Sequence, residues 1–383
     1  MVICDKNKCS GCAACIAICR HNAITMKLDR DGFLYPIIDM EKCTDCGLCR
    51  KGCPQVNLTK ENQINSLAYL CWDIKTSSRL ASSSGGIFSV IARDILSKGG
   101  VVCSAAYDDN MYLRHIIIDN ICDLSRLQGS KYMQSDIGHC FVQIKKALKQ
   151  NKLVYFVGTP CQVAGLKSYL KIDYNNLITS DLICHGVPST KLFQQQITRL
   201  EDKYTSKIVD FKFRSKKRFG QGYDCEIKFR GGDNKFLCAE LIPFFYGFWN
   251  NFTLRDCCYQ CKYASLDRIG DITLGDFWLV KKIFPNIKTS KGISLILINT
   301  PKGLEVFDSI KENIYYREVT LEQGAIGQGQ LKSPVVRPEK REQYTTCDLD
   351  HLEKDLLRIP LTYKCKMHLR NFFKLLLFYK LWK

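Results

Sequence analysis

Apolar and polar residues follow two different patterns along the 383-residue chain. Near the N-terminus, two short segments alternate apolar and polar residues on either side of Asp31-Gly32, which predicts a β-hairpin with a tight turn. Further along, strand-like runs and segments of helical spacing follow each other, beginning with LAYLCW and GGIFSVIARDILSKGG. The rhythm continues in VVCSAAY, HIIID, CFVQIKKALKQ, LVYFVG and TPCQVAGLKSYL. We therefore predict an α+β fold class, with a small N-terminal domain followed by a larger α/β domain.

Eight cysteines near the N-terminus form two copies of one pattern. In each copy, three cysteines stand three residues apart and a fourth follows, as in Cys9, Cys12, Cys15 and Cys19. Such runs hold 4Fe-4S clusters, and in two-cluster proteins the fourth cysteine of each run ligates the cluster of the other run. The prediction is one cluster on Cys9, Cys12, Cys15 and Cys53, and a second on Cys43, Cys46, Cys49 and Cys19. Zinc sites also use CxxC pairs, but seldom three evenly spaced cysteines followed by a fourth.

This region resembles the bacterial two-cluster ferredoxins over about residues 1–57. Arg20 follows the first run where such proteins usually carry Pro, whereas Pro54 follows the second run. We expect ligation to survive this difference, with an effect on the local turn and on the potential of that cluster. A domain of this size has little apolar core, so we expect the clusters to supply much of its folding free energy.

Composition and charge predict a cellular location and a class of binding partner. The chain holds 22 cysteines, but its first residues include no apolar signal segment and no stretch is long enough to span a bilayer. We therefore expect a reducing, cytoplasmic location rather than a secreted disulfide scaffold. The formal net charge is +18, and three clusters would lower it to about +12 because each carries about −2. Part of the excess lies in FKFRSKKRFG (211–220) and favours an acidic partner, whereas nucleic acid is not expected because no recognition motif accompanies the charge.

The larger domain carries an ordered set of short motifs. They are SSSGGIFS (82–89), GSKYMQS (129–135), GTPCQVAGL (158–166), DLICHGVPS (181–189), Cys258-x2-Cys261 and DITLGDFW (271–278). With these motifs the chain resembles the beta subunits of coenzyme F(420) hydrogenases and dehydrogenases over about residues 68–310. That family also looks similar to the plant reductase of 7-hydroxymethyl chlorophyll. The resemblance implies a reductase that contains FAD and an additional 4Fe-4S cluster close to the flavin.

The sequence also supports this third cluster. We predict that its ligands are Cys161, Cys184, Cys258 and Cys261. Cys161 and Cys184 follow apolar strand-like runs, where side chains converge at one edge of a sheet. The adjacent Cys257 could take the place of Cys258 as a ligand of this cluster. As alternatives, Cys161 or Cys184 could be a buried core thiol, or Cys161 a low-pKa thiolate at a helix N-terminus.

Three short segments are candidates for binding the flavin. Ser83, Ser84, Gly85 and Gly86 lack bulk and offer backbone N–H groups at a helix start, where the FAD pyrophosphate could lie. The family resemblance places Gly129, Ser130, Lys131 and Tyr132 near the flavin, and Gly158 and Thr159 form a strand-to-helix turn that suits a phosphate. As alternatives, the first segment could be an ordinary Ser-capped turn, and the segment from Gly129 to Tyr132 could be a solvated helix end. The sequence does not identify catalytic residues.

These motifs divide the chain into five segments. We predict a two-cluster ferredoxin domain (1–57), a linker (58–67), N-terminal (68–155) and C-terminal (156–320) parts of an α/β flavin-binding domain, and a basic extension (321–383). The predicted function is an iron–sulfur flavoprotein oxidoreductase that takes electrons from a low-potential donor or redox partner protein and reduces an organic substrate or a deazaflavin. The alternative is an electron-relay subunit that docks to a separate catalytic partner.

The C-terminal segment 361–383 is basic and rich in aromatic residues, with no Asp or Glu. It is too short and too charged to span a membrane. Such a helix could lie in the interface of an anionic bilayer, or it could pack on its own domain or on a second copy.

Overall fold

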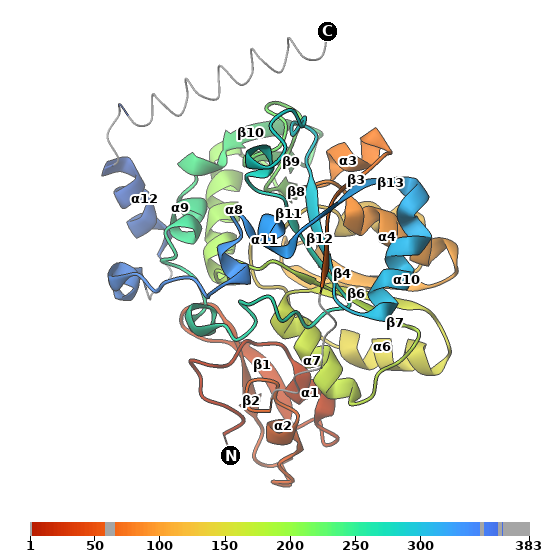
Figure 1. Cartoon of the computed structure of the whole chain (residues 1–383). Helices are drawn as coiled ribbons and strands as arrows, with labels where there is room; N and C mark the ends of the chain where they lie inside the picture. The colour runs from red at the N-terminus through yellow and green to blue at the C-terminus, as the bar shows by residue number, and fades with distance from the viewer. Residues whose placement is uncertain (1, 58–65, 345–347, 359–361, 363–383) are drawn as a thin grey trace.

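The computed structural model describes residues 2–57, 66–344, 348–358 and 362 (Figure 1). The chain forms a small N-terminal domain, at the bottom of Figure 1, beneath a larger α/β domain. The predicted α+β class is therefore confirmed. The predicted helix within 361–383 lies outside the described residues, apart from Thr362.

The small domain is a hairpin flanked by two short helices. Its elements are α1 (Ala14–Ile18), β1 (Ile24–Leu28), β2 (Leu34–Ile38) and α2 (Leu48–Lys51). β1 and β2 pair antiparallel with Leu28 opposite Leu34, so the predicted hairpin is confirmed. The Oδ1 atom of Asp29 accepts hydrogen bonds from the backbone N–H groups of Asp31 and Phe33 at 3.1 and 3.0 Å, which closes the turn.

The large domain is built on an eight-stranded mixed sheet. The strands are β3 (Leu67–Asp73), β4 (Val101–Tyr107), β5 (Leu113–Ile118), β6 (Val154–Gly158), β7 (Leu177–Leu182), β11 (Ile272–Asp276), β12 (Ser294–Ile298) and β13 (Ile314–Val319). Their order is β13-β3-β12-β11-β7-β6-β4-β5, and β4, β6, β7 and β11 run parallel. The strands predicted from LAYLCW, VVCSAAY, HIIID and LVYFVG are all present. The predicted division at residues 155 and 156 falls inside β6, and both parts contribute strands to the one sheet.

Helices cover both faces of this sheet (Figure 1). They are α3 (Thr76–Ala81), α4 (Ile87–Ser97), α5 (Leu124–Leu127), α6 (Cys140–Lys149), α7 (Pro160–Leu170), α10 (Pro301–Ile310) and α11 (Leu321–Ala325). The apolar faces of α4 and α10 share one core with β3, β6 and β12, whereas α6 and α7 pack on the opposite side. α1 of the small domain packs against α7, where a side chain on Gly165 would lie 3.0 Å from the Cys12 sulfur. The two domains therefore meet along α7, where Ser168 Oγ also donates to the Gly52 carbonyl at 2.8 Å.

A second, three-stranded antiparallel sheet was not expected from the sequence. It consists of β8 (Ile208–Lys212), β9 (Asp224–Phe229) and β10 (Asn234–Cys238), in the order β10-β9-β8. It packs with α8 (Thr190–Tyr204), α9 (Pro243–Trp249) and α12 (Leu349–Arg358) around a core of buried phenylalanines. The short 3-10 helices are η1 (Ile121–Asp123), η2 (Ala239–Leu241), η3 (Asp256–Gln260), η4 (Val280–Lys282), η5 (Lys311–Asn313), η6 (Gly329–Leu331) and η7 (Glu339–Tyr344).

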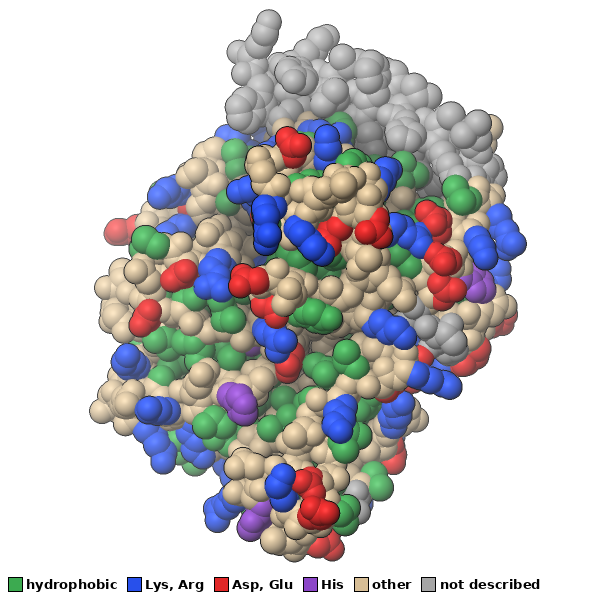
Figure 2. All heavy atoms as spheres, turned by 180° about the vertical axis from the view of Figure 1, so that it is seen from behind, with side chains coloured by type: hydrophobic (Ala, Val, Ile, Leu, Met, Phe, Trp, Pro, Cys, Tyr) green, Lys and Arg blue, Asp and Glu red, His purple; other side chains and the backbone are tan. Residues whose placement is uncertain are grey.

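The basic segment 211–220 is largely engaged within the fold rather than free for a partner. Arg214 pairs with Asp276, Arg218 pairs with Asp224, and Lys216 is buried. On the face seen in Figure 2, Lys and Arg side chains lie interspersed with acidic ones. Within the described residues, no helix has both the length and the apolar character needed to cross a bilayer.

Candidate redox site

Two cysteine-lined cavities lie in the small domain. Cys9, Cys12, Cys15 and Cys53 line the first, which we call the proximal cavity. Cys19, Cys43, Cys46 and Cys49 line the second, the distal cavity. The structure thus brings together three cysteines of one run and the fourth of the other, in the grouping that the spacing predicts.

The backbone around the two cavities repeats one conformation. Gly11 (φ 65°) and Ala13 (φ 62°) flank Cys12, and Asp45 (φ 53°) and Gly47 (φ 70°) flank Cys46 at the equivalent positions. Such left-handed residues turn successive backbone N–H groups inward and form concave sites that bind anions, including iron–sulfur clusters. A 4Fe-4S cluster with four thiolates carries about −2, so the cavity backbone fits its charge. In the sequence, the duplicated cysteine pattern was the signal for this repeated backbone conformation.

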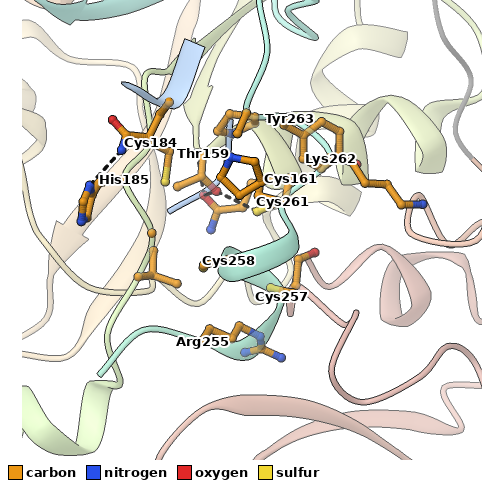
Figure 3. A pocket seen from close by; sticks show the side chains of 18 of the residues that line it. Thr159, Cys161, Cys184, His185, Arg255, Cys257, Cys258, Cys261, Lys262 and Tyr263 are labelled. Atoms are coloured by element: carbon orange, nitrogen blue, oxygen red, sulfur yellow. Dashed lines mark hydrogen bonds between the residues drawn. The ribbon is translucent and has the colours of Figure 1, made fainter. Parts of the chain in front are cut away.

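A third cavity, the inner cavity, lies in the large domain beside the small one. It is lined by Cys161, Cys184, Cys258 and Cys261, and also by Cys257. Figure 3 shows that these side chains approach the cavity from separate segments. Cys161 stands in the first turn of α7 and Cys184 follows β7; β6 and β7 are parallel neighbours, so their carboxyl ends share one edge of the sheet. Cys257 and Cys258 belong to η3, and both adjacent cysteines remain candidates for the same ligand position.

The loop after β7 has to pass close to η3. Gly186 has a φ of 138°, and a side chain there would lie 2.9 Å from Leu254 and 3.3 Å from the Cys258 Cβ atom. Glycine therefore lets the segment that carries Cys184 approach the segment that carries Cys258. Across the described residues, no three His, Cys, Asp or Glu side chains converge closely enough to hold one metal ion.

Burial favours the neutral thiol at several of these cysteines. It raises the pKa of Cys12 and that of Cys261 to about 12. Cys4, which was not singled out in the sequence, hydrogen-bonds to Cys9 and lowers the pKa of that thiol to about 6. Metals bind the thiolate, so cluster assembly in these cavities would release protons.

A large cavity of about 360 Å³ adjoins the inner cavity. Nine of the ten predicted flavin residues line it: Ser83, Ser84, Gly86, Gly129, Ser130, Lys131, Tyr132, Gly158 and Thr159. Gly85 does not, because its N–H group donates to Ser294 Oγ at 2.9 Å and a side chain on it would lie 2.6 Å from the Cys71 carbonyl. Gly85 therefore shapes the turn and does not face the cavity.

Hydrogen bonds join the first two flavin motifs. Ser83 Oγ accepts from the Ser130 N–H at 2.7 Å, which holds the two segments together at the start of α4. Lys131 Nζ donates to the backbone carbonyls of Gln128 and Gly129 at 3.0 and 3.3 Å, and burial lowers its pKa to about 8. Lys216, which the sequence did not mark as a site residue, donates to the Arg79 and Lys291 carbonyls at 2.7 and 2.9 Å beneath the same turn.

Two histidines lie along the large cavity. His185 also lines the inner cavity; its Nε2 atom is 2.8 Å from Asn251 Oδ1, and burial lowers its pKa. His115 lies between Ser135 Oγ, 2.9 Å from its Nδ1 atom, and the Val157 carbonyl, 3.1 Å from its Nε2 atom. Burial lowers the pKa of His115 to about 4, so this ring is neutral at physiological pH. Tyr223 and Trp278 also line this cavity and stack with their ring centroids 5.8 Å apart.

The four cavities follow one another in a series, and three of them share lining residues. Ser10 and Gln55 line both the proximal and the inner cavity. Thr159, Gln162, Cys184 and His185 line both the inner and the large cavity. The distal cavity lies at the other end of α1, which joins Cys15 to Cys19. The order is therefore distal, proximal, inner, large.

Two family models match this chain. Residues 151–323 match the C terminus of the coenzyme F420 hydrogenase/dehydrogenase beta subunit, and residues 8–57 match the 4Fe-4S dicluster domain. Residues 151–323 therefore form a C-terminal domain of this beta-subunit type, and a dicluster domain precedes it. The resemblance predicted from the sequence motifs is thereby confirmed. The protein is an iron–sulfur electron-transfer protein of an oxidoreductase family.

The chain is also similar to individual proteins. A subunit of the F(420)H(2) dehydrogenase of Methanosarcina mazei is 25% identical over 321 residues, which cover 81% of this chain and 84% of the relative. The coenzyme F420-dependent sulfite reductase of Methanocaldococcus jannaschii is 23% identical over 326 residues, 83% of this chain and 48% of the relative. A solved structure of the F420-reducing [NiFe] hydrogenase complex from Methanosarcina barkeri has a TM-score of 0.44 at 14% identity, covering 79% of this chain and 94% of that one.

Proposed function

We propose that the protein is an iron–sulfur flavoprotein oxidoreductase. In this proposal 4Fe-4S clusters occupy the distal, proximal and inner cavities, FAD occupies the large cavity, and electrons move along this series from a low-potential donor to an organic substrate or a deazaflavin. The observation that carries the proposal is the order of the cavities, in which the inner cavity shares lining residues with both the proximal and the large cavity. A bound flavin exchanges single electrons with iron–sulfur centres and hydride with organic molecules.

The residues of the large cavity fit a flavin in three respects. The first turn of α4 leaves backbone N–H groups without intrahelical partners, and these suit the pyrophosphate. Gly86 begins that turn with a φ of 94°, and Gly129 leaves open space where a side chain would stand, with Ser83 Oγ at 3.9 Å. The remaining wall includes apolar and aromatic side chains such as Phe88 and Trp278, which can pack on a ring system.

The surface near the distal cavity suits the entry of electrons. Cys46 is exposed, whereas Cys9, Cys12, Cys15, Cys49 and Cys53 are buried. A donor or partner protein that docks there would approach the cluster most remote from the large cavity. One relative is named as part of a dehydrogenase, so the second candidate function is a relay subunit that passes electrons to a separate catalytic protein.

The composition of the purified protein tests the proposal. Anaerobically purified full chain is expected to contain about twelve irons and one FAD. Cys258→Ser should lower the content to about eight irons, while the matched replacement of its neighbour, Cys257→Ser, should leave about twelve. Zinc in place of iron, or no flavin after gentle purification, would overturn the proposal. Reduction of a small-molecule acceptor by the isolated chain would exclude the relay function; activity only with a partner protein would favour it.

A further inference from the structure

One buried arginine lies between the proximal and the inner cavity. Arg255 is 0% exposed and directly precedes η3, where its carbonyl accepts from the Cys258 N–H at 2.9 Å. Its side chain reaches into the small domain: Nε donates to the Cys9 carbonyl at 2.7 Å, and Nη2 lies 3.8 Å from the Cys9 sulfur. Figure 3 shows Arg255 beside Cys257 and Cys258, on the side of the inner cavity that faces the small domain.

Apart from the Cys9 sulfur, the partners of this guanidinium group are neutral. Nη1 donates to Gln134 Oε1 at 2.8 Å and Nη2 donates to the Leu34 carbonyl at 2.9 Å. The Tyr35 ring centroid lies 4.1 Å from the guanidinium carbon. In the described part of the chain, no carboxylate forms an ion pair with Arg255. The adjacent Asp256 is directed elsewhere and pairs with Arg337 at 3.0 Å.

Two other buried arginines of the large domain, Arg268 and Arg214, differ in this respect, whereas the buried Arg79 donates to the Gly292 carbonyl. Arg268 is similarly inaccessible, but its Nη2 atom lies 2.9 Å from the carboxylate of Asp181. Arg214 likewise pairs with Asp276. A buried cation without a nearby negative charge is unfavourable by several kcal/mol per ion. Arg255 lies between the cysteines of the proximal and inner cavities. Negatively charged clusters bound there would compensate its positive charge.

We infer that Arg255 is the shared counter-charge of the iron–sulfur clusters in the proximal and inner cavities, and that it raises the reduction potentials of both. This inference rests on the proposed function. Reduction adds one electron to a cluster that already carries about −2, and a fixed positive charge stabilises the more negative state. The effect is strong where water is excluded. The distal cluster has no corresponding contact with Arg255, so its potential serves as an internal reference.

Gln134 positions the arginine. Its Nε2 atom donates to the Ser10 carbonyl at 2.9 Å while its Oε1 atom accepts from Arg255, so the same amide ties the small domain to the guanidinium group. Gly11 leaves the room for this arrangement, because a side chain there would lie 2.6 Å from Gln134 Nε2 and 2.9 Å from Arg255 Nη1. These contacts fix the charge relative to both cavities.

A redox titration of the full chain, followed by electron paramagnetic resonance, tests the inference. The distal and inner clusters are assigned as the signals lost in Cys43→Ser and Cys258→Ser. Arg255→Gln is expected to make the reduction of the proximal and inner clusters at least tenfold less favourable, which is about 59 mV for a one-electron couple. The distal potential should not move. Arg255→Lys keeps the positive charge, so the reduction equilibria of the proximal and inner clusters should each change by less than threefold.

Two further variants make the result decisive. Lys262→Gln removes an exposed charge that lines the same inner cavity, and solvent screening predicts a much smaller shift than for Arg255→Gln. Gln134→Glu places a carboxylate against the guanidinium group and should lower the same two potentials without removing Arg255. If Arg255→Gln does not retain its iron, the potentials of Gln134→Glu still test the inference.

Equal shifts at all three clusters, no shift in Arg255→Gln or Gln134→Glu, or an equal effect of Lys262→Gln would overturn the inference. Failure of the proposed function has a different signature, because a missing third iron–sulfur signal would contradict the inner cluster. The effect of Arg255 on the proximal cluster could still be measured in that case.

Discussion

The small domain and the large domain differ in what fills their interiors. Around the cavities of the small domain, buried cysteines such as Cys15, Cys49 and Cys53 pack with only a few apolar side chains, among them Ile3 and Ile24. In the large domain, residues of the sheet pack against α4 and α10 in one core, and phenylalanines around α8 and α9 form another. The small domain is thus organised around its cysteines, whereas the large domain has an apolar core that does not depend on them.

This contrast has a consequence for folding. A domain of about fifty residues buries too little apolar surface to be stable without additional links, and metal ligation can supply them. The inner cavity lies on the other side of the boundary, where the sheet, α7 and η3 already fix the four cysteine positions. We therefore expect the loss of one ligand to have different effects in the two domains.

The largest effect should come from removing one thiolate in the small domain. Cys19→Ser is expected to lose the distal cluster, about four of twelve irons, and with it much of the amide protection of β1 and β2 in hydrogen exchange. The matched variant Cys261→Ser should also lose about four irons but keep protection throughout both domains. Spectroscopic loss of the proximal instead of the distal cluster in Cys19→Ser would contradict the ligand grouping. Equal loss of protection in both variants would contradict the contrast between the domains.

The same contrast explains which features could be predicted from the sequence. The hairpin and the cysteine quartets of the small domain follow from spacing within a short stretch of chain. In the large domain, the alternation of β4, β5, α6, β6 and α7 was predicted because each element carries its own periodicity. Local patterns of this kind are independent of the rest of the fold.

Features that depend on distant contacts were not predicted. Arg255 and Cys9 are 246 positions apart, and no local pattern in FTLRDCC distinguishes this arginine from a surface one. The basic segment 211–220 suggested an exposed patch, because its acidic partners Asp224 and Asp276 come later in the chain. Gly85 looked like its neighbours in SSSGG, and only the packing against β3 and β12 distinguishes it.

An intermediate effect is expected from Asp181, in the core of the large domain. Its carboxylate accepts from Arg268 at 2.9 Å, from Thr273 Oγ1 at 2.7 Å and from the Gly270 N–H at 3.0 Å. Asp181→Ala leaves the Arg268 charge buried without its partner and should lower the free energy of unfolding by about 3–5 kcal/mol. Asp173→Ala, which breaks the exposed pair with Lys302, should cost less than about 1 kcal/mol.

Urea unfolding followed by tryptophan fluorescence measures this difference. None of the four tryptophans of the chain lies within residues 1–57, and Trp72, Trp249 and Trp278 belong to the large domain, so their signal reports on that domain. A loss below about 1 kcal/mol for Asp181→Ala would show that the large domain does not depend on this buried pair.

The smallest expected effect concerns the pH dependence of the large domain. The pKa of His115 is lowered by burial from 6.5 to about 4. The unfolded chain therefore binds a proton between these values that the folded chain does not, so stability is full above pH 6.5 and falls as the pH drops towards 4. At about pH 5.5 the loss should be roughly 1.4 kcal/mol relative to about pH 7.5. In the same urea titration, His115→Asn should be less stable than the unchanged protein at both pH values. Its loss of stability from the higher to the lower pH should be smaller by about the same 1.4 kcal/mol. Acid damage to the clusters is common to both proteins, so an equal loss in the variant would remove His115 as the source of the pH dependence.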